Sequence, residues 1–322
     1  MTSRVAETLF QLAHLYMSDP QADRVQADKA LDQLAPYAAD PASVPQLAMQ
    51  LALDRARYGD DPWYRAIPTE AELADFDLDR ALAIYRDRFV DAGDFVYVVV
   101  GDVGAAEVRD LAGRYLGTLP TARTMEDFVD RRPDPPGGVV DERVEAGTGD
   151  QGSVLLAYAA PYVVDEQDDL GLQVLELILD GRLRDRLREQ LGATYSPSVT
   201  IQAVDRPDRI IDSQILIGND PARVDEIGTE ARQVVDDLVS TGPTADEFAT
   251  AVEQVRRRIE LFSNPSLASA ILSTALQGDG LDDYLRRDQL LADLTIGDVE
   301  RLATVAFPPR RYVEIRQVPE GF

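Results

Sequence analysis

The stretch Leu73-Ala-Asp-Phe76 returns near the end of the chain as Leu291-Ala-Asp-Leu294. In both places an amphipathic helical pattern follows, ends in a phenylalanine and gives way to a stretch expected to be a strand. One offset, 218, relates three pairs of positions: Leu73 with Leu291, Leu78 with Ile296, and Phe89 with Phe307. Self-similarity at a fixed period is the signature of a repeated structural unit. The sequence therefore predicts two related copies of one helix-and-strand unit.

A second block supports the repeat. The pattern Leu15…Pro20…Val25 returns as Leu238…Pro243…Phe248 at an offset of 223. Amphipathic helices resemble one another by chance, but two ordered blocks at nearly one period favour a repeat. Counting back from Val139 by this period places the start of the first copy about 80 residues before Met1. We therefore expect the first copy to lack its N-terminal third and the chain to be a fragment or part of an assembly.

The boundary between the copies is expected at Arg131–Gly138, where three prolines and two glycines continue neither helix nor strand. This gives a truncated first domain over residues 1–130, a linker over 131–138 and a complete second domain over 139–322. Helices are expected over residues 41–58 (capped by Asp40), 78–89, 105–116, 170–179 and 244–261, and strands over 95–100, 154–158, 199–203, 211–217 and 312–318. Mixed elements with antiparallel-looking spacing predict the α+β class, with helices packed on a mostly antiparallel sheet.

Composition excludes several classes of function. Apolar residues make up 45% of the chain, enough for a sizeable core. Without cysteine there is no disulfide, iron–sulfur cluster or thiol nucleophile. A net charge of −26 argues against nucleic acid and against anionic membranes as partners; it fits a solubilising surface better than attraction of cationic ligands. The start of the chain lacks a signal-peptide pattern, which leaves open the cytoplasm or, for a piece of an exported enzyme, the periplasm or exterior.

Two regions carry longer patterns. The first runs from Leu9–Tyr16 through Tyr58–Pro62 and Val98–Asp102 to Tyr115–Pro120, and the second, Asp180–Pro197, contains Leu187-Arg-Glu-Gln-Leu-Gly-Ala-Thr-Tyr-Ser196. Both resemble the pitrilysin/insulinase zinc metallopeptidases. The first is similar to the later two-thirds of one repeat domain of that family, and the second to an "L-R-E-x-x-G-x-x-Y-S" signature in the C-terminal half. The resemblance implies most of the third and all of the fourth of four related α+β domains, whose two halves close around an unfolded peptide.

The resemblance also assigns roles to residues. In the family, the C-terminal half supplies an arginine and a tyrosine that hold the substrate backbone, and these positions fall on Arg188 and Tyr195. A helix ending at Gly192 and a strand starting near Tyr195 would aim both side chains at one cleft. The alternative is a surface ion pair for Arg188 and simple packing for Tyr195. We expect the nearby arginines to face solvent and acidic neighbours: Arg182, Arg184 and Arg186.

No catalytic or metal-binding residue is assigned to this chain. The family holds zinc on an H-x-x-E-H helix, whereas this sequence contains one histidine, His14, on an apolar helical stretch that predicts a structural role. Zinc is therefore expected in the missing or partner half. The expected partners are a peptide substrate and a catalytic metallopeptidase half or homologous subunit. The alternative function is a non-peptidase scaffold or interaction subunit built on the same fold.

Overall fold

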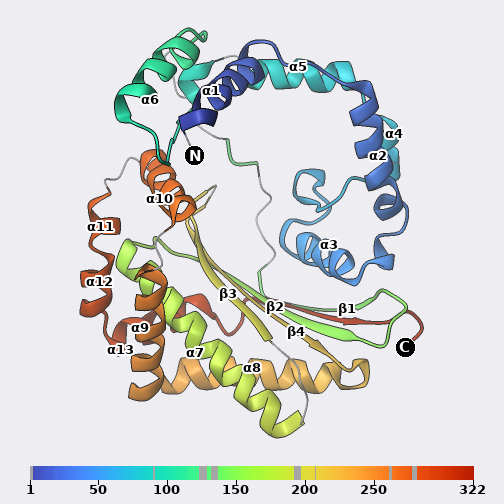
Figure 1. Cartoon of the computed structure of the whole chain (residues 1–322). Coiled ribbons are helices and arrows are strands. Elements are labelled where there is room, and N and C mark those ends of the chain that lie inside the picture. The colour runs from blue at the N-terminus through green and yellow to red at the C-terminus, as the bar shows by residue number, and fades with distance from the viewer. Residues whose placement is uncertain are drawn as a thin grey trace. The chain divides into compact units, whose positions relative to one another are not determined.

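The computed structural model in Figure 1 describes residues 3–89, 91–122, 129–131, 137–191, 197–206, 208–260, 263–277 and 281–322. Within these residues the chain forms thirteen α-helices and a five-stranded sheet. The chain divides into two compact units. Unit 1 holds residues 1–34, 71–128 and 261–285, and unit 2 holds residues 35–70, 129–260 and 286–322.

The sheet lies in unit 2, with strand order β1-β5-β2-β4-β3. Strands β1 and β5 are parallel, and all other neighbours are antiparallel. This confirms the predicted α+β class with a mostly antiparallel sheet. The strands are β1 Val139–Glu145, β2 Gly152–Pro161, β3 Pro197–Val204, β4 Ile210–Asn219 and β5 Tyr312–Val318.

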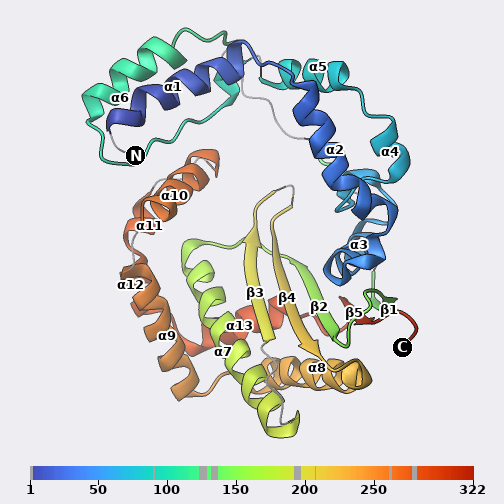
Figure 2. The ribbon, with the colours of Figure 1, turned by 45° about the vertical axis from the view of Figure 1, so that its right-hand side comes forward.

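One face of this sheet is covered by a layer of helices built around α7, Glu166–Leu191 (Figure 2). Helix α7 contacts β3 and four other helices: α8 Val224–Thr241, α9 Ala245–Glu260, α12 Arg287–Asp293 and α13 Ile296–Ala306. Leu172, Leu175 and Leu179 of α7 are almost fully buried in the main core. A helix that is apolar on most of its surface needs burial on all sides, so α7 is the centre of this layer.

The opposite face of the sheet is covered by α3, Pro45–Tyr58. Met49 and Leu53 of α3 pack against Leu155 of β2 and against Val313 and Ile315 of β5. Strands buried on both faces carry continuous apolar runs rather than alternating ones. The apolar run in β2 is therefore explained by two covering layers.

The regular structure of unit 1 is helical within the described residues, and none of these residues lies in a β-strand. Ala6 and Phe10 of α1 and Leu111 of α6 form a small buried cluster. The helices are α1 Ser3–Ser18, the first part of α2 Arg24–Ala39, α4 Glu70–Ala74, α5 Leu78–Phe89, α6 Ala105–Leu111 with a π-helical turn Ala112–Leu116, α10 Asn264–Gln277 and α11 Asp282–Leu285. This buried cluster is much smaller than that of unit 2.

Several expected elements are confirmed. Helix α5 covers Leu78–Phe89 and strand β5 covers Tyr312–Val318, as expected. The capping box at the start of α9 is present, with the Glu247 amide donating to Thr244 Oγ1 at 3.2 Å and the Thr244 amide donating to the Glu247 carboxylate at 2.7 Å. These features depend on local periodicity and short-range hydrogen bonds.

Two expectations are wrong. Residues 95–100 form neither helix nor strand, and none of their side chains is buried. The helix expected from Pro41 is instead a 3-10 turn, Pro41–Ser43, followed by α3 from Pro45, and the Asp40 side chain makes no cap hydrogen bond. Pro45 fits the first turn of a helix, where its missing N–H costs nothing, so the helix starts there.

The helices of the two halves correspond in order. Helices α2 and α9 are related by an offset of 221 at both ends, and α3 and α10 by an offset of 219 at both ends. The last positions of α1 and α8 are related by an offset of 223, and the first positions of α5 and α13 by 218. We refer to the segments before and after the linker as the first and second copy. The residue boundaries of the two domains stay a prediction, and residues 132–136 of the linker lie outside the described residues.

The correspondence explains why the two units are discontinuous along the chain. Helix α3 belongs to the first copy but lies in unit 2, and its counterpart α10 belongs to the second copy but lies in unit 1. Each unit therefore combines helices from both copies.

Candidate functional site

The region of the signature lies at the C-terminal end of α7. Helix α7 continues to Leu191, one turn beyond Arg188, and β3 begins at Pro197. Residues 192–196, and with them Tyr195 and the expected helix end at Gly192, lie outside the described residues. The structure therefore places Arg188 but leaves its proximity to Tyr195 a prediction.

The three arginines that precede Arg188 are paired with carboxylates. Arg182 bonds both carboxylate oxygens of Glu247, at 2.7 and 2.8 Å, and also the Gly242 carbonyl at 2.8 Å. Its hydrogen bonds are the main cause that lowers the pKa of Glu247 to about 2. Arg184 pairs with Asp180, and Arg186 Nε lies 2.8 Å from Glu230. The expected acidic neighbours are present, although Arg182 is largely buried rather than solvent-facing.

Arg188 differs from the three arginines that precede it. Its side chain is exposed, and it pairs with no carboxylate in the part of the chain that the structure describes. The surface ion pair that was the alternative for Arg188 is thus not formed with a described residue. An exposed guanidinium offers five N–H donors in a planar fork, which suits a carbonyl or carboxylate ligand.

A polar hollow lies beside the start of β3. Its volume is about 260 Å³, and Glu176 and Asp180 of α7, Ser198 of β3 and Arg258 of α9 contribute to its lining. Glu176 Oε2 accepts a hydrogen bond from the Ile201 amide at 3.2 Å, and Glu176 Oε1 lies 3.8 Å from Arg258. The described lining does not include Arg188.

Strand β3 is one of the two edges of the sheet, and β1 is the other. An edge strand offers unpaired backbone groups to an extended peptide. β1 carries four charged residues among seven, a common protection against pairing. β3 carries none, but the Glu176 carboxylate occupies the Ile201 amide. Of the two edges, β3 is therefore the more suitable one for an added peptide. At Ile201, a peptide carbonyl would have to replace the Glu176 carboxylate as the acceptor of the amide hydrogen bond.

The chain's own residues do not fit a zinc site of the family type. His14 Nδ1 lies 2.7 Å from the Tyr115 carbonyl oxygen, a contact that suits the predicted structural role. Over the described ranges, no three His, Cys, Asp or Glu side chains are grouped closely enough to hold a metal ion. A search of the same residues for a helix with the length and apolarity of a membrane span also finds none.

Sequence reasoning did not identify Glu176 as a partner of β3, nor the ion pair between Arg57 of α3 and Asp212 of β4. Both contacts join residues that are far apart in the chain or on different elements. None of Glu176, Arg57 and Asp212 belongs to a motif, so a single sequence gives no signal for either contact.

Comparison with known proteins adds the family. The family described as "Peptidase M16 inactive domain" matches residues 75–255, more than half of the chain. The chain is 28% identical over 286 residues to a probable zinc protease PqqL of Escherichia coli, covering 87% of the chain and 29% of the relative. It is 27% identical over 241 residues to a probable zinc protease PqqL of Haemophilus influenzae, covering 70% and 25%. The chain thus spans less than a third of the length of these relatives.

Two solved structures share the fold. The periplasmic protease PqqL of Escherichia coli superposes with a TM-score of 0.81 at 20% identity, covering 98% of this chain and 35% of that one. A peptidase M16 inactive domain from Pseudomonas fluorescens superposes with a TM-score of 0.80 at 18% identity, covering 98% and 76%. The family match confirms the resemblance seen in the sequence: the chain belongs to the peptidase M16 inactive-domain family, related to the C-terminal half of insulinase-type zinc proteases.

Proposed function

We propose that this chain is the non-catalytic, substrate-binding C-terminal half of a zinc metalloendopeptidase and acts on peptides only together with a half that carries H-x-x-E-H. The match to an inactive domain of a peptidase family carries this proposal. It is supported by the two relatives, which are described as probable zinc proteases and of which this chain covers less than a third. The same relationship, and the periplasmic relative, favour the periplasm as the place where the assembled enzyme works.

The proposed peptide site is the outer edge of β3 together with Arg188 and Tyr195. An extended peptide added to β3 would hydrogen-bond the strand through its backbone, which is a sequence-tolerant mode of recognition. Arg188 would donate to a peptide carbonyl, and the Tyr195 hydroxyl would donate to the same oxygen. At Ile201 the peptide carbonyl would replace the Glu176 carboxylate.

The test combines this chain with Escherichia coli PqqL from which the matching segment has been deleted. An unfolded fluorogenic peptide should be cleaved, in the presence of zinc, only when both polypeptides are present. Loss of one charge-assisted hydrogen bond is worth about 1.5–3 kcal/mol, or about 10–100-fold in kcat/KM. We expect Arg188→Ala to reduce kcat/KM by this factor and Tyr195→Phe by about 10-fold.

Arg184→Ala is the matched control, because Arg184 lies one turn earlier on α7 and pairs with Asp180 at the surface. It should change kcat/KM by less than about twofold. If the two polypeptides associate but cleave nothing, or if Arg188→Ala behaves like Arg184→Ala, the substrate-binding role is refuted. The first of these results is the one expected of a scaffold or interaction subunit.

A further inference from the structure

One acidic side chain of α7 lies at the outer edge of β3. The Glu176 carboxylate accepts a hydrogen bond from the Ile201 amide at 3.2 Å. Ile201 is paired with Ser213 of β4 in an antiparallel register, and its amide bonds Glu176 instead of β4, so this amide points away from the sheet. An added strand would use an amide in this position. Glu176 therefore takes the place of a carbonyl of such a strand.

The same carboxylate borders the polar hollow beside the start of β3. Leu177 of α7 and Val199 of β3 supply apolar parts of its lining, and Glu176, Asp180 and Arg258 supply charged parts. Glu176 and Asp180 are 24% and 23% exposed, so both carboxylates are partly withdrawn from water. The hollow therefore combines an apolar and a charged lining beside an edge strand.

A peptide added to β3 would place one side chain in this hollow. Residues directly opposite each other in neighbouring strands point to the same face of the sheet. Val199 is partly buried against the main core, on the face of the sheet that α7 covers. The peptide residue opposite Val199 would therefore point its side chain towards α7 and into the hollow that Val199 lines.

The chemistry of Glu176 restricts which side chain suits the hollow. When a peptide carbonyl takes the Ile201 amide, the Glu176 carboxylate loses a hydrogen-bond donor. Among the described residues it then keeps Arg258, whose Nη1 lies 3.8 Å away, beyond hydrogen-bond distance. A partly buried carboxylate without a donor is costly. A peptide side chain that donates to Glu176 removes this cost.

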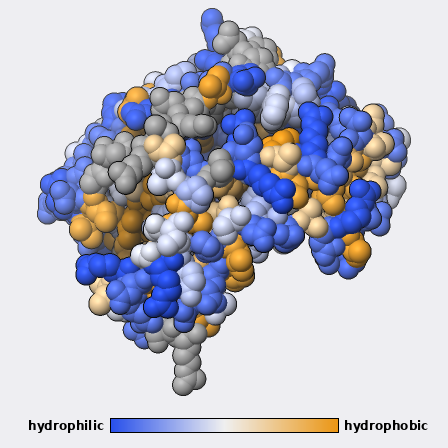
Figure 3. Space-filling view, turned by 90° about the horizontal axis from the view of Figure 1, so that it is seen from above, coloured by the Kyte–Doolittle hydropathy of each residue, from blue (hydrophilic) through white to orange (hydrophobic). Residues whose placement is uncertain are grey.

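The net charge of the chain acts in the same direction but does not select a position. The face seen in Figure 3 is largely hydrophilic, with smaller apolar patches between the hydrophilic residues. A net charge of −26 gives a general attraction for cations. Glu176 and Asp180 place negative charge at one defined point beside β3.

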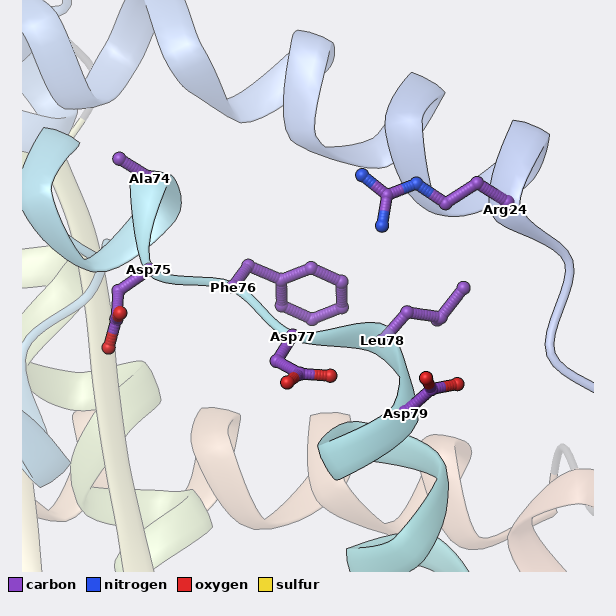
Figure 4. A pocket seen from close by; sticks show the side chains of 7 residues that line it. All are labelled: Arg24, Ala74, Asp75, Phe76, Asp77, Leu78 and Asp79. Carbon is purple, nitrogen blue, oxygen red and sulfur yellow. The ribbon is translucent and has the colours of Figure 1, made fainter.

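The hollow in Figure 4 lacks this combination. Its volume is about 580 Å³, and Phe76 and Leu78 project towards it from the link between α4 and α5, whereas Arg24 projects from α2 (Figure 4). None of its described lining residues belongs to a strand, so it offers no edge amide to a peptide backbone. Of these two hollows, the one beside β3 can therefore hold a side chain of a peptide whose backbone is bound to a strand.

We propose that the hollow beside β3 is a subsite for one arginine or lysine side chain of the peptide, and that Glu176 determines this specificity. A peptide carbonyl takes the Ile201 amide, and the released Glu176 carboxylate accepts from the basic side chain. The aliphatic stem of that side chain covers Leu177 and Val199. This subsite rests on the proposed addition of a peptide to β3.

The test measures the binding of peptides to the full chain by fluorescence anisotropy. Three labelled, extended peptides of otherwise uncharged residues differ at one central position, which is arginine, leucine or glutamate. One charge-assisted hydrogen bond at a partly exposed site should make the arginine peptide bind about 10-fold more tightly than the leucine peptide. The glutamate peptide should bind more weakly than either.

Glu176→Ala separates the subsite from the general attraction of an acidic chain. It removes the acceptor of the basic side chain and frees the Ile201 amide. The leucine peptide should then bind about 3-fold more tightly and the arginine peptide about 3-fold more weakly, so that the preference disappears. A purely structural effect would weaken both peptides. Asp185→Asn is the matched control, because Asp185 is exposed on the same helix outside the described lining; it should change either affinity by less than about twofold.

Arg258→Met removes the internal partner of Glu176 and should strengthen binding of the arginine peptide by about 3-fold. If the glutamate peptide binds best and loses its affinity in Arg258→Met, the hollow takes acidic side chains and the proposal is overturned. An arginine preference that survives Glu176→Ala would overturn it as well. Equal binding of all three peptides would overturn the subsite and leave the peptide-binding role of β3 intact, whereas a chain that binds none of them would overturn both.

Discussion

Replacing Arg57 should release α3 from the sheet of unit 2. Its NH2 and NH1 groups lie 2.6 and 3.3 Å from the two carboxylate oxygens of Asp212 on β4, and the two side chains are only 14% and 12% exposed. Among the described residues, Asp212 also accepts a hydrogen bond from the side-chain amide of Gln214 at 3.2 Å. Removing one member of a buried ion pair leaves an uncompensated charge, at a cost of about 3–5 kcal/mol. Partial exposure and Gln214 reduce this, so we expect Arg57→Met to lower the free energy of unfolding by about 2–3 kcal/mol.

The assay is urea denaturation followed by far-ultraviolet circular dichroism, with a double-mutant cycle of Arg57→Met and Asp212→Leu. Arg55→Met is the matched control, because Arg55 lies on the same helix and pairs with Glu142 at 3.3 Å while 56% exposed. It should cost less than about 0.5 kcal/mol. If Arg57→Met and Arg55→Met cost the same within about 0.5 kcal/mol, the reasoning from burial is refuted.

Three further predictions concern single positions. The hydrogen bond from Arg182 is the main cause that lowers the pKa of Glu247 from 4.5 to about 2 in the folded chain, so its stabilisation is complete above about pH 4.5 and is lost as the pH falls towards 2. Glu247→Gln should remove this pH dependence in unfolding titrations. Gly147 has a φ of +77° and an added Cβ would lie 2.7 Å from a proline ring, so calorimetry should show a cost of about 1–3 kcal/mol for Gly147→Ala. His14→Gln should cost about 1 kcal/mol, and isothermal titration should show unchanged heats with Zn²⁺.

The sequence pattern was sufficient to predict the elements that depend on local periodicity. The amphipathic period of Leu78–Phe89 and the strand pattern of Tyr312–Val318 predicted α5 and β5 at the observed bounds. The pattern was insufficient for β1, Val139–Glu145, where four charged residues conceal a parallel edge strand. Its pairing partner β5 lies at the far end of the chain, and such pairings leave little trace in a short window of sequence.

The strand expected at residues 95–100 fails for a different physical reason. Phe95–Val100 has the composition of a buried strand, and its counterpart β5 is one. A strand, however, exists only through hydrogen bonds to neighbours, and none of the described residues provides them here. The strand expected at these residues is therefore wrong, although the corresponding residues 312–318 form β5. For the candidate site, Arg188 was identified by resemblance alone, since its lack of a described carboxylate partner follows from contacts that a sequence does not contain.

The proposed substrate-binding role of Arg188, at the end of α7, can be tested separately from the association of the two polypeptides. Arg188→Ala should lower cleavage while leaving association unchanged, because Arg188 makes no hydrogen bond or ion pair with a described residue. Loss of association with Arg188→Ala would instead assign Arg188 to the assembly rather than to the substrate.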